Sequence, residues 1–199
     1  MVRVGISVEG ITEERFIKTL LVPYLQSKGI FVTPVPMNGN ISVDRVSYEL
    51  EKLAYSFDYV TTFYDFYGFK HKHASETKET LQSKIKESIK DHLQRKLLPY
   101  IQMYEFEGLL FSSPEAIAAV LQNESHLTWA NSILAEFDYN PEKVNDSRET
   151  APSKRFENNT HYRKTTHGPD IAERIGLVKL REMCLGFDQW LTALERLVS

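Results

Sequence analysis

Acidic side chains follow three apolar or aromatic stretches that are typical of strands. Glu9 ends "RVGISVEG", Asp65 lies near the end of "YVTTFYDFYG", and Glu105 and Glu107 lie within "LPYIQMYEFEGLLF". If these stretches are parallel strands of one sheet, their carboxyl ends share one edge, where open α/β sheets hold their ligands. Carboxylates gathered at such an edge repel one another unless protons or a cation occupy the space between them.

The ligand types favour a hard divalent cation. Oxygen ligands suit Mg²⁺ or Mn²⁺, which keep water or a substrate phosphate in the rest of their shell. The only cysteine, Cys184, excludes a Cys-rich zinc site and an internal disulfide. Both Glu105 and Glu107 point into the site if their strand continues, and only one does if it has ended. Of the two, we favour Glu105. The alternative for Glu9 and Asp65 is a solvated acid in a turn before a glycine.

A local cluster of basic residues lies between positions 153 and 168. It contains Lys154, Arg155, Arg163 and Lys164, with His161 and His167, against the single acid Glu157. Because the formal net charge of the chain is −3, an anionic ligand must be held by such a local cluster. Basic clusters bind phosphate backbones. The alternative is an exposed loop whose lysines only confer solubility. Another pair, His71 and His73, resembles metal ligands, but we interpret "KHKH" as a solvated basic loop.

The pattern of elements predicts how these residues are positioned. Strand-like and helix-like stretches alternate over the first 120 residues or so, which indicates an α/β fold with a four-stranded, mainly parallel sheet flanked by helices. Helices are predicted from Thr12, with Glu13 and Glu14 in the first turn, over 42–57, and over 77–97. Pro34 and Pro36 place the second strand at an edge. We expect an α/β core over 1–120 and a helical C-terminal extension over 121–199, whose basic loop (153–168) packs on the core.

Composition fits an ordinary globular chain of 199 residues, with 42% hydrophobic and 26% charged residues. The N-terminus lacks the pattern of a signal peptide, and no window approaches the length of an apolar membrane span. We therefore expect a soluble cytoplasmic protein without a membrane partner. No Gly-x-Gly-x-x-Gly follows the first strand, which argues against a dinucleotide-binding domain.

Several motifs resemble a known superfamily. "VEGITEERF" resembles the first motif of toprim domains, the metal-binding fold of topoisomerases, primases, OLD-type nucleases and small RNA-maturing nucleases, and "YDFYGF" occupies the place of the toprim Asp-x-Asp motif. Four further stretches resemble a family of short stand-alone bacterial toprim-like proteins, often encoded beside an ABC-type ATPase in suspected phage-defence loci. These stretches are "YEFEGLLF", "APSKRF", "YRKTTHGPDIAERIGL" and "CLGFDQWL".

This resemblance implies a toprim-like fold and a nuclease that depends on Mg²⁺ or Mn²⁺. Glu9 corresponds to the signature acid, and Asp65 to the first aspartate of Asp-x-Asp. Lys164 resembles the lysine that OLD-type toprim sites use near the reacting phosphate. The sequence departs from the pattern in two places. Tyr67 replaces the second aspartate, which Glu105 or Glu107 could substitute, and Tyr104 stands where the closer family usually has histidine.

Two functions of different classes follow. The first is a metal-dependent nuclease for DNA or RNA, the effector of an ATPase-coupled bacterial defence system, with a co-encoded ABC-type ATPase as partner. The second is a non-catalytic toprim-like subunit that binds the ATPase or nucleic acid, in which the missing second aspartate marks a decayed site. Assembly into a homo-oligomer is open in both.

Overall fold

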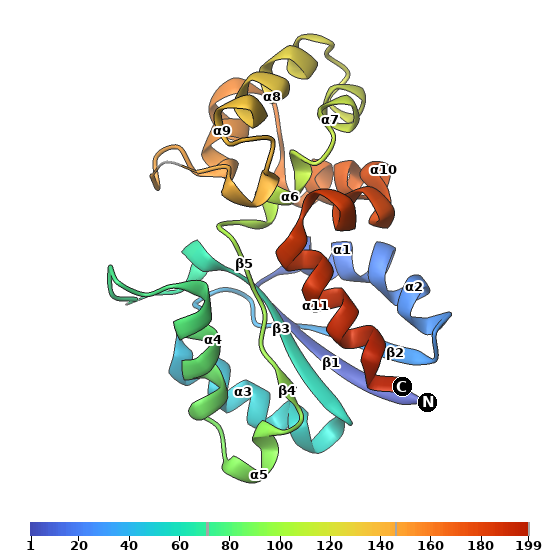
Figure 1. Cartoon of the computed structure of the whole chain (residues 1–199), viewed down its shortest axis with the longest axis vertical. Helices are drawn as coiled ribbons and strands as arrows, with labels where there is room; N and C mark the ends of the chain where they lie inside the picture. Colours follow the sequence, from blue (N-terminus) through green and yellow to red (C-terminus); the bar gives the residue numbers. More distant parts are fainter. Residues whose placement is uncertain (71, 146, 199) are drawn as a thin grey trace.

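The structure is a computed structural model that describes residues 1–70, 72–145 and 147–198 (Figure 1). The first half contains β1 (Val2–Val8), α1 (Ile11–Phe16), the π-helical η1 (Ile17–Leu21), α2 (Val22–Gln26), β2 (Ile30–Pro36), α3 (Val43–Ser56), β3 (Tyr59–Asp65), η2 (Phe66–Gly68), α4 (Lys78–Glu87) and α5 (Asp91–Gln94). The second half contains β4 (Leu97–Leu98), β5 (Ile101–Gln102), α6 (Phe106–Leu110), α7 (Pro114–Val120), α8 (Ser125–Glu136), η3 (Pro141–Lys143), α9 (Pro152–Asn159), α10 (Lys164–Met183), α11 (Leu185–Glu195) and η4 (Arg196–Val198).

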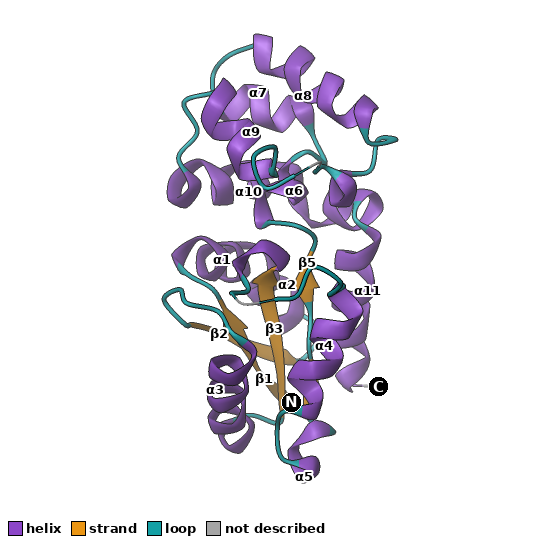
Figure 2. Ribbon diagram, turned by 90° about the vertical axis from the view of Figure 1, so that its left-hand side faces the viewer, coloured by secondary structure: helices purple, strands orange, loops and turns teal. Residues whose placement is uncertain are grey.

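The sheet is parallel throughout, in the order β2, β1, β3, β4, and β5 continues the β4 position along β3. This confirms the predicted α/β fold and places β2 at an edge. Side chains alternate between the two faces of the sheet. Val4 and Phe63 join the apolar cluster under α1, α2 and α11, whereas Val60 and Tyr64 join the cluster under α3 and α4 (Figure 2).

The fourth strand is much shorter than the sequence predicts. Only Leu97–Leu98 and Ile101–Gln102 pair with β3, and Pro99, which has no backbone N–H to donate, lies between them. The chain then leaves the sheet, and "FEGLL" forms α6 instead of a continued strand. The predicted helix over 77–97 is likewise divided into α4 and α5.

The segment 153–168, which its polarity predicts to be a loop, is mostly helical. Pro152 begins α9, where its missing N–H costs nothing. One aromatic side chain anchors this helix: Phe156 is fully buried and packs against Phe111 and Tyr162. After a short extended stretch, α10 begins at Lys164. A polar helix with one apolar anchor carries too weak a periodicity to be read from the sequence.

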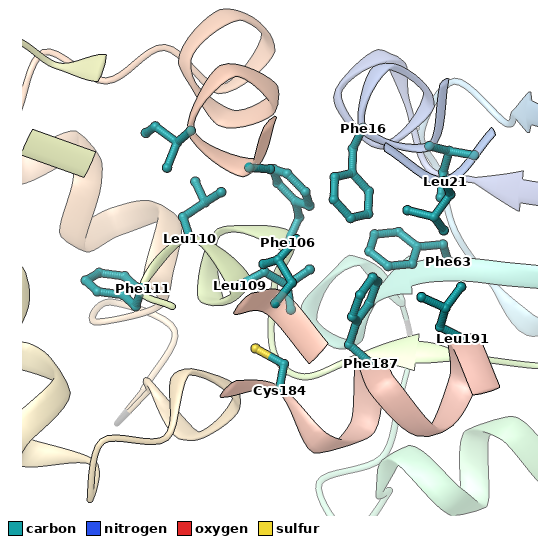
Figure 3. Close-up of a cluster of buried hydrophobic side chains, with 14 of the residues drawn as sticks. Phe16, Leu21, Phe63, Phe106, Leu109, Leu110, Phe111, Cys184, Phe187 and Leu191 are labelled. Atoms are coloured by element: carbon teal, nitrogen blue, oxygen red, sulfur yellow. The ribbon is translucent and has the colours of Figure 1, made fainter. Parts of the chain in front are cut away.

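One aromatic cluster joins the sheet to the later helices (Figure 3). Phe16 of α1 lies 5.5 Å from Phe63 of β3, 5.3 Å from Phe106 of α6 and 6.0 Å from Phe187 of α11, measured between ring centroids. The first turn of α6 is therefore held against the sheet by packing. None of the helices in the described part of the chain is long and apolar enough to cross a membrane.

Candidate active site

The turn after β1 places two glutamates at the carboxyl edge of the sheet. Glu9 follows the strand directly, and Gly10 caps α1. The Gly10 N–H donates to Glu13 Oε2 over 3.0 Å, so the third residue of the helix reaches back to the end of the strand. Oε2 of Glu9 and Oε1 of Glu13 are buried without a hydrogen-bond partner among the described residues. Such orphaned oxygens are costly and favour a ligand between them.

Gly68 makes room for the Glu9 carboxylate. A Cβ atom built on Gly68 would lie 2.3 Å from Glu9 Oε2, far inside contact distance. The end of β3 and the η2 turn after it thus have two roles. They provide the carboxylate of Asp65, and they leave the space that the Glu9 carboxylate fills.

Asp65 fixes the position of α6, which carries the next acid. Its Oδ1 accepts a hydrogen bond from the Phe106 N–H over 2.7 Å. Glu107, in the first turn of α6, is fully buried, and its Oε1 accepts from the Tyr162 hydroxyl over 3.3 Å. Glu105 directs Oε2 to the Ser153 N–H at the start of α9, over 2.8 Å. The strand has ended before both glutamates, and the preference for Glu105 is wrong: the side chain at the centre of the cluster is that of Glu107, because α6 turns it inward and Glu105 is bound to the start of α9.

Lys164 brings one ammonium group into this acid cluster. Its Nζ lies 3.4 Å from Glu107 Oε2, 3.5 Å from Asp65 Oδ2 and 3.7 Å from Glu13 Oε1. The side chain as a whole is 43% exposed, so the ammonium group reaches inward from a stem that lies at the surface. We call Glu9, Glu13, Asp65, Glu107 and Lys164 the acid cluster.

The acid cluster holds more negative charge than one ammonium group can balance. Burial raises the pKa of Asp65 and of Glu107, against the opposing effect of Lys164. Burial and then the Glu13 carboxylate raise the pKa of Glu9. For Lys164 burial lowers the pKa, but the surrounding carboxylates outweigh it and raise the pKa well above its ordinary value. Further positive charge is therefore favoured at this site.

The donor set suits a hard divalent cation, although the carboxylates are not yet gathered around one point. Among the described residues, no three His, Cys, Asp or Glu side chains are close enough together to hold a metal ion as they stand. The ammonium group of Lys164 lies between them instead. All available donors are carboxylate oxygens, and two of these accept no hydrogen bond from the described residues, which is the chemistry that Mg²⁺ and Mn²⁺ require.

The other basic residues predicted to bind nucleic acid are not part of the acid cluster. Lys154 is exposed and pairs with Glu157 over 2.5 Å. Arg155 donates to the Thr150 carbonyl oxygen and lies 3.6 Å from Glu136. Arg163 is exposed at the start of α10. Of the four predicted residues, the structure brings Lys164 to the acids.

The histidine pair and Glu13 were both interpreted as lying outside the site. His71 lies outside the described residues, and His73 is exposed, with its backbone N–H donating to Glu76. Glu13 was expected only to favour the helix dipole, yet it is 2% exposed and contacts Lys164. Its position, three residues after the glycine that caps the helix, is the capping-box spacing and could have indicated that it turns back toward Glu9.

The fold and the site define an α/β protein with an acidic rim at the carboxyl edge of a parallel sheet. Residues 8–195 match the family described as a domain of unknown function, DUF4276, and the chain belongs to that family. No protein with a curated description matches it at a significant level.

Solved structures with a similar fold include two OLD proteins. The C-terminal region of the Burkholderia pseudomallei OLD protein is 12% identical, with a TM-score of 0.59 over 100% of both chains. The C-terminal region of the Xanthomonas campestris pv. campestris OLD protein is also 12% identical, with a TM-score of 0.46 over 98% of both chains. The first of these confirms the fold that the resemblance to OLD-type toprim proteins predicted, and the fold alone.

Proposed function

We propose that this protein is a metal-dependent nuclease that hydrolyses phosphodiester bonds of DNA or RNA. One observation carries the proposal: three carboxylates lie within 3.7 Å of a single ammonium group, Glu9 lies beside them, and two buried carboxylate oxygens of the cluster have no hydrogen-bond partner among the described residues. A structural nucleic-acid-binding surface has no need to bury several acids together, because these repel a phosphate backbone. A fold shared with the C-terminal region of an OLD protein supports the same function.

The roles follow from the contacts. Glu9, Glu13, Asp65 and Glu107 would hold Mg²⁺ or Mn²⁺, and Glu105, already bound to the start of α9, supports them from outside. When bound, the ion polarises a phosphoryl oxygen and lowers the pKa of a water.

The protein's own groups supply the remaining steps. Lys164 stabilises the charge that develops on the reacting phosphate. Glu9, whose pKa is raised by burial, accepts the proton of the attacking water. Asp65 also keeps α6 in place through the Phe106 N–H, and so holds Glu107 at the site.

A second candidate is a non-catalytic toprim-like subunit. It is favoured by the replacement of the second aspartate by Tyr67 and by the position of Lys164, which occupies the centre of the carboxylates. Such a protein would bind an ATPase or nucleic acid and would leave its substrate intact.

We also propose a partner, a co-encoded ABC-type ATPase that controls cleavage in a bacterial defence system. The support is the resemblance of the motifs, together with the fact that the similar fold in the Burkholderia protein is one region of a longer chain. The test is cleavage by the protein alone against cleavage in the presence of the neighbouring ATPase with and without ATP. Full activity alone and no complex with the ATPase would remove the partner from the proposal.

The test of the nuclease uses plasmid, single-stranded DNA and transfer RNA with Mg²⁺ or Mn²⁺, beside Mn²⁺ binding by calorimetry. Glu9→Gln should weaken Mn²⁺ binding at least about 10-fold and cleavage about 100-fold or more. Glu14→Gln is the matched control, because this glutamate pairs with Lys18 outside the acid cluster. Mn²⁺ binding without cleavage of any substrate, even with the ATPase, would favour the non-catalytic subunit. No Mn²⁺ binding would refute the metal site itself.

A further inference from the structure

A group of aromatic rings lies beside the acid cluster, just after the end of β3. The rings of Tyr67 and Tyr104 are 5.4 Å apart between centroids, and Phe66 lies 6.0 Å from the first and 6.2 Å from the second. Phe66 is buried, whereas both tyrosines are half-buried and present part of their surface to solvent. Tyr67 stands where the toprim pattern has its second acid, so this chain has an aromatic ring at a position where that pattern has a carboxylate.

Two cations from distant parts of the sequence lie over these rings. Lys72 Nζ is 4.9 Å from the ring centre of Phe66 and 5.2 Å from that of Tyr67. The guanidinium of Arg148 is 5.5 Å from the ring centre of Tyr67. Asn145, close to Arg148 in sequence, donates a hydrogen bond to the Tyr67 hydroxyl over 2.7 Å. The segments after β3 and before α9 thus contact each other through the side chain of Tyr67.

Among the described residues, no carboxylate lies within ion-pair distance of Lys70, Lys72 or Arg148, whereas Lys84 nearby pairs with Glu76. Burial and then the charge of Arg148 lower the pKa of Lys72. Like charges that are held together in this way favour an anion between them.

Tyr67, Phe69 and the cations line a pocket of about 450 Å³, a size that suits a small ligand. Its lining residues are Tyr67, Gly68, Phe69, Lys70, Lys72 and Arg148. Gly68 is the glycine against which the Glu9 carboxylate lies, so the pocket and the acid cluster share one wall. A group bound in this pocket is therefore adjacent to the acid cluster.

We propose that this pocket, the Tyr67 pocket, binds one unpaired nucleotide of a single-stranded nucleic acid, with its base against the ring of Tyr67 and its phosphate between Lys70, Lys72 and Arg148. The inference rests on the nuclease proposal and narrows its substrate class. Bases stack on aromatic side chains without regard to sequence, and cations hold the backbone. In a duplex the faces of the bases are covered by their neighbours and are not free to meet a ring. The next phosphodiester of a strand bound here lies at the acid cluster.

The test measures binding without metal, so that it does not depend on cleavage. Fluorescence anisotropy in EDTA compares a labelled oligothymidylate, an oligouridylate of equal length and a duplex of that length. We expect each single strand to bind at least about 10-fold more tightly than the duplex. Tyr67→Leu should weaken single-strand binding about 10-fold or more, while Tyr67→Phe, which keeps the ring and loses only the bond to Asn145, should stay within about 3-fold. The two single strands show whether DNA or RNA is preferred.

A second variant tests the cations, and a similar pair elsewhere provides the control. Lys72→Ala with Arg148→Ala should weaken binding and reduce the slope of log affinity against log salt by about 2. Lys52 lies 3.9 Å over the ring of Tyr48 on α3, and neither residue lines this pocket, so Lys52→Ala with Tyr48→Leu is the matched control and should bind as the wild type does.

The outcomes separate the two proposals. Equal affinity for duplex and single strand, or unchanged binding by both the Tyr67→Leu and the double cation variant, overturns the Tyr67 pocket even if the protein cleaves nucleic acid. Single-strand binding that depends on these residues, in a protein that never cleaves, supports the pocket and removes the nuclease. If Tyr67→Leu lowers the melting temperature too far for a binding assay, Tyr67→Phe and the double cation variant still decide the question.

Discussion

Replacing Lys164 by methionine removes the one ammonium group in the acid cluster and keeps a side chain of similar length. The change leaves Asp65, Glu107 and Glu13 facing one another with no cation among them. Like charges in such a site are destabilising unless protons are taken up. We therefore expect Lys164→Met to lower the free energy of unfolding in metal-free buffer, by an amount that depends on pH.

The contacts set the scale of this loss. At 3.5 Å and an effective dielectric constant of about 20, one charge pair has a gross energy of about 5 kcal/mol. The net value is much smaller, because the Lys164 side chain is 43% exposed and screened by solvent. Proton uptake also limits the loss of stability, because a protonated carboxyl no longer repels its neighbours. Holding one ordinary carboxyl protonated costs about 4 kcal/mol at pH 7 and about 1 kcal/mol at pH 5. We expect a loss of about 1–3 kcal/mol at pH 7.5 and under about 1 kcal/mol at pH 5.

The direction with pH follows from the raised pKa values of the carboxyls. Asp65 and Glu107 bind protons more tightly in the folded state, so their contribution to stability is fully present below the ordinary carboxyl pKa and is lost as pH rises through the raised pKa. Without Lys164 these pKa values rise further, and the loss of folding stability extends over a wider range of pH. The ammonium group itself stays charged between pH 5 and pH 7.5, so the carboxyls account for the change.

The assay is thermal unfolding in EDTA at the two pH values. A domain of this size should lose about 2–4 °C of melting temperature per kcal/mol, and Mg²⁺ or Mn²⁺ should narrow the gap between Lys164→Met and the wild type. Lys154→Met removes an equally exposed lysine that pairs only with Glu157, and should leave the melting temperature unchanged at both pH values. An equal loss at pH 5 and pH 7.5, or a loss in the Lys154→Met control as large as in Lys164→Met, would refute the electrostatic account.

Two further substitutions test the scaffold around the acid cluster. Gly68→Ala places a methyl group against the Glu9 carboxylate, which can swing away, so we expect a melting temperature within about 3 °C of the wild type but weaker Mn²⁺ binding by calorimetry; unchanged affinity would show that this glutamate does not bind the metal from its present position. Arg181→Met removes the partner of Asp188 and Glu195, which links α10 to α11, and should lower the free energy of unfolding by about 1–3 kcal/mol near pH 7. Burial raises the pKa of Glu195, but its hydrogen bonds, led by the one from Arg181, outweigh burial and lower the pKa. The stability that Arg181 and Glu195 contribute is therefore present above the ordinary carboxyl pKa and is lost at lower pH. In urea unfolding near pH 3, the loss caused by Arg181→Met should therefore become smaller. An equal loss at both pH values would contradict the role of the ion pairs.

Local patterns were sufficient to predict the part of the site that lies on β1 and β3. Glu9 and Asp65 each follow a stretch whose β-type pattern is unmistakable, and parallel strands bring such ends to one edge. The end of the next strand was not predictable in this way. Its extent depends on how far β3 offers a partner, and on the hydrogen bond from the Phe106 N–H to Asp65 that starts α6. The choice between Glu105 and Glu107 follows from that single tertiary contact.

The position of Lys164 was likewise not predictable from local sequence patterns. Its neighbours in the sequence are polar, so no apolar periodicity marks the first turns of the helix that it begins. The placement comes from the packing of Phe156 and Tyr162, which are single apolar residues in a polar stretch and are brought together only in the folded chain. A resemblance of motifs could indicate this lysine, whereas spacing along the chain could not, because it lies far in sequence from every acid that it contacts.

The end of β3 is where the two proposals meet, because it separates charges of opposite sign. On one side Asp65 adds a carboxylate to a site that favours more positive charge, and on the other Tyr67 lies under Lys72 and Arg148, two cations for which the described residues offer no carboxylate within ion-pair distance. Gly68 lies between the acid cluster and the Tyr67 pocket, and it has no side chain that would separate them. A single strand that crosses this glycine would place one phosphate among the cations and the next at the metal ligands, so its direction along the surface would be set before any chemistry begins. The exchange of an acid for Tyr67 would then be a gain in substrate binding, which is the opposite of what a decayed site would require.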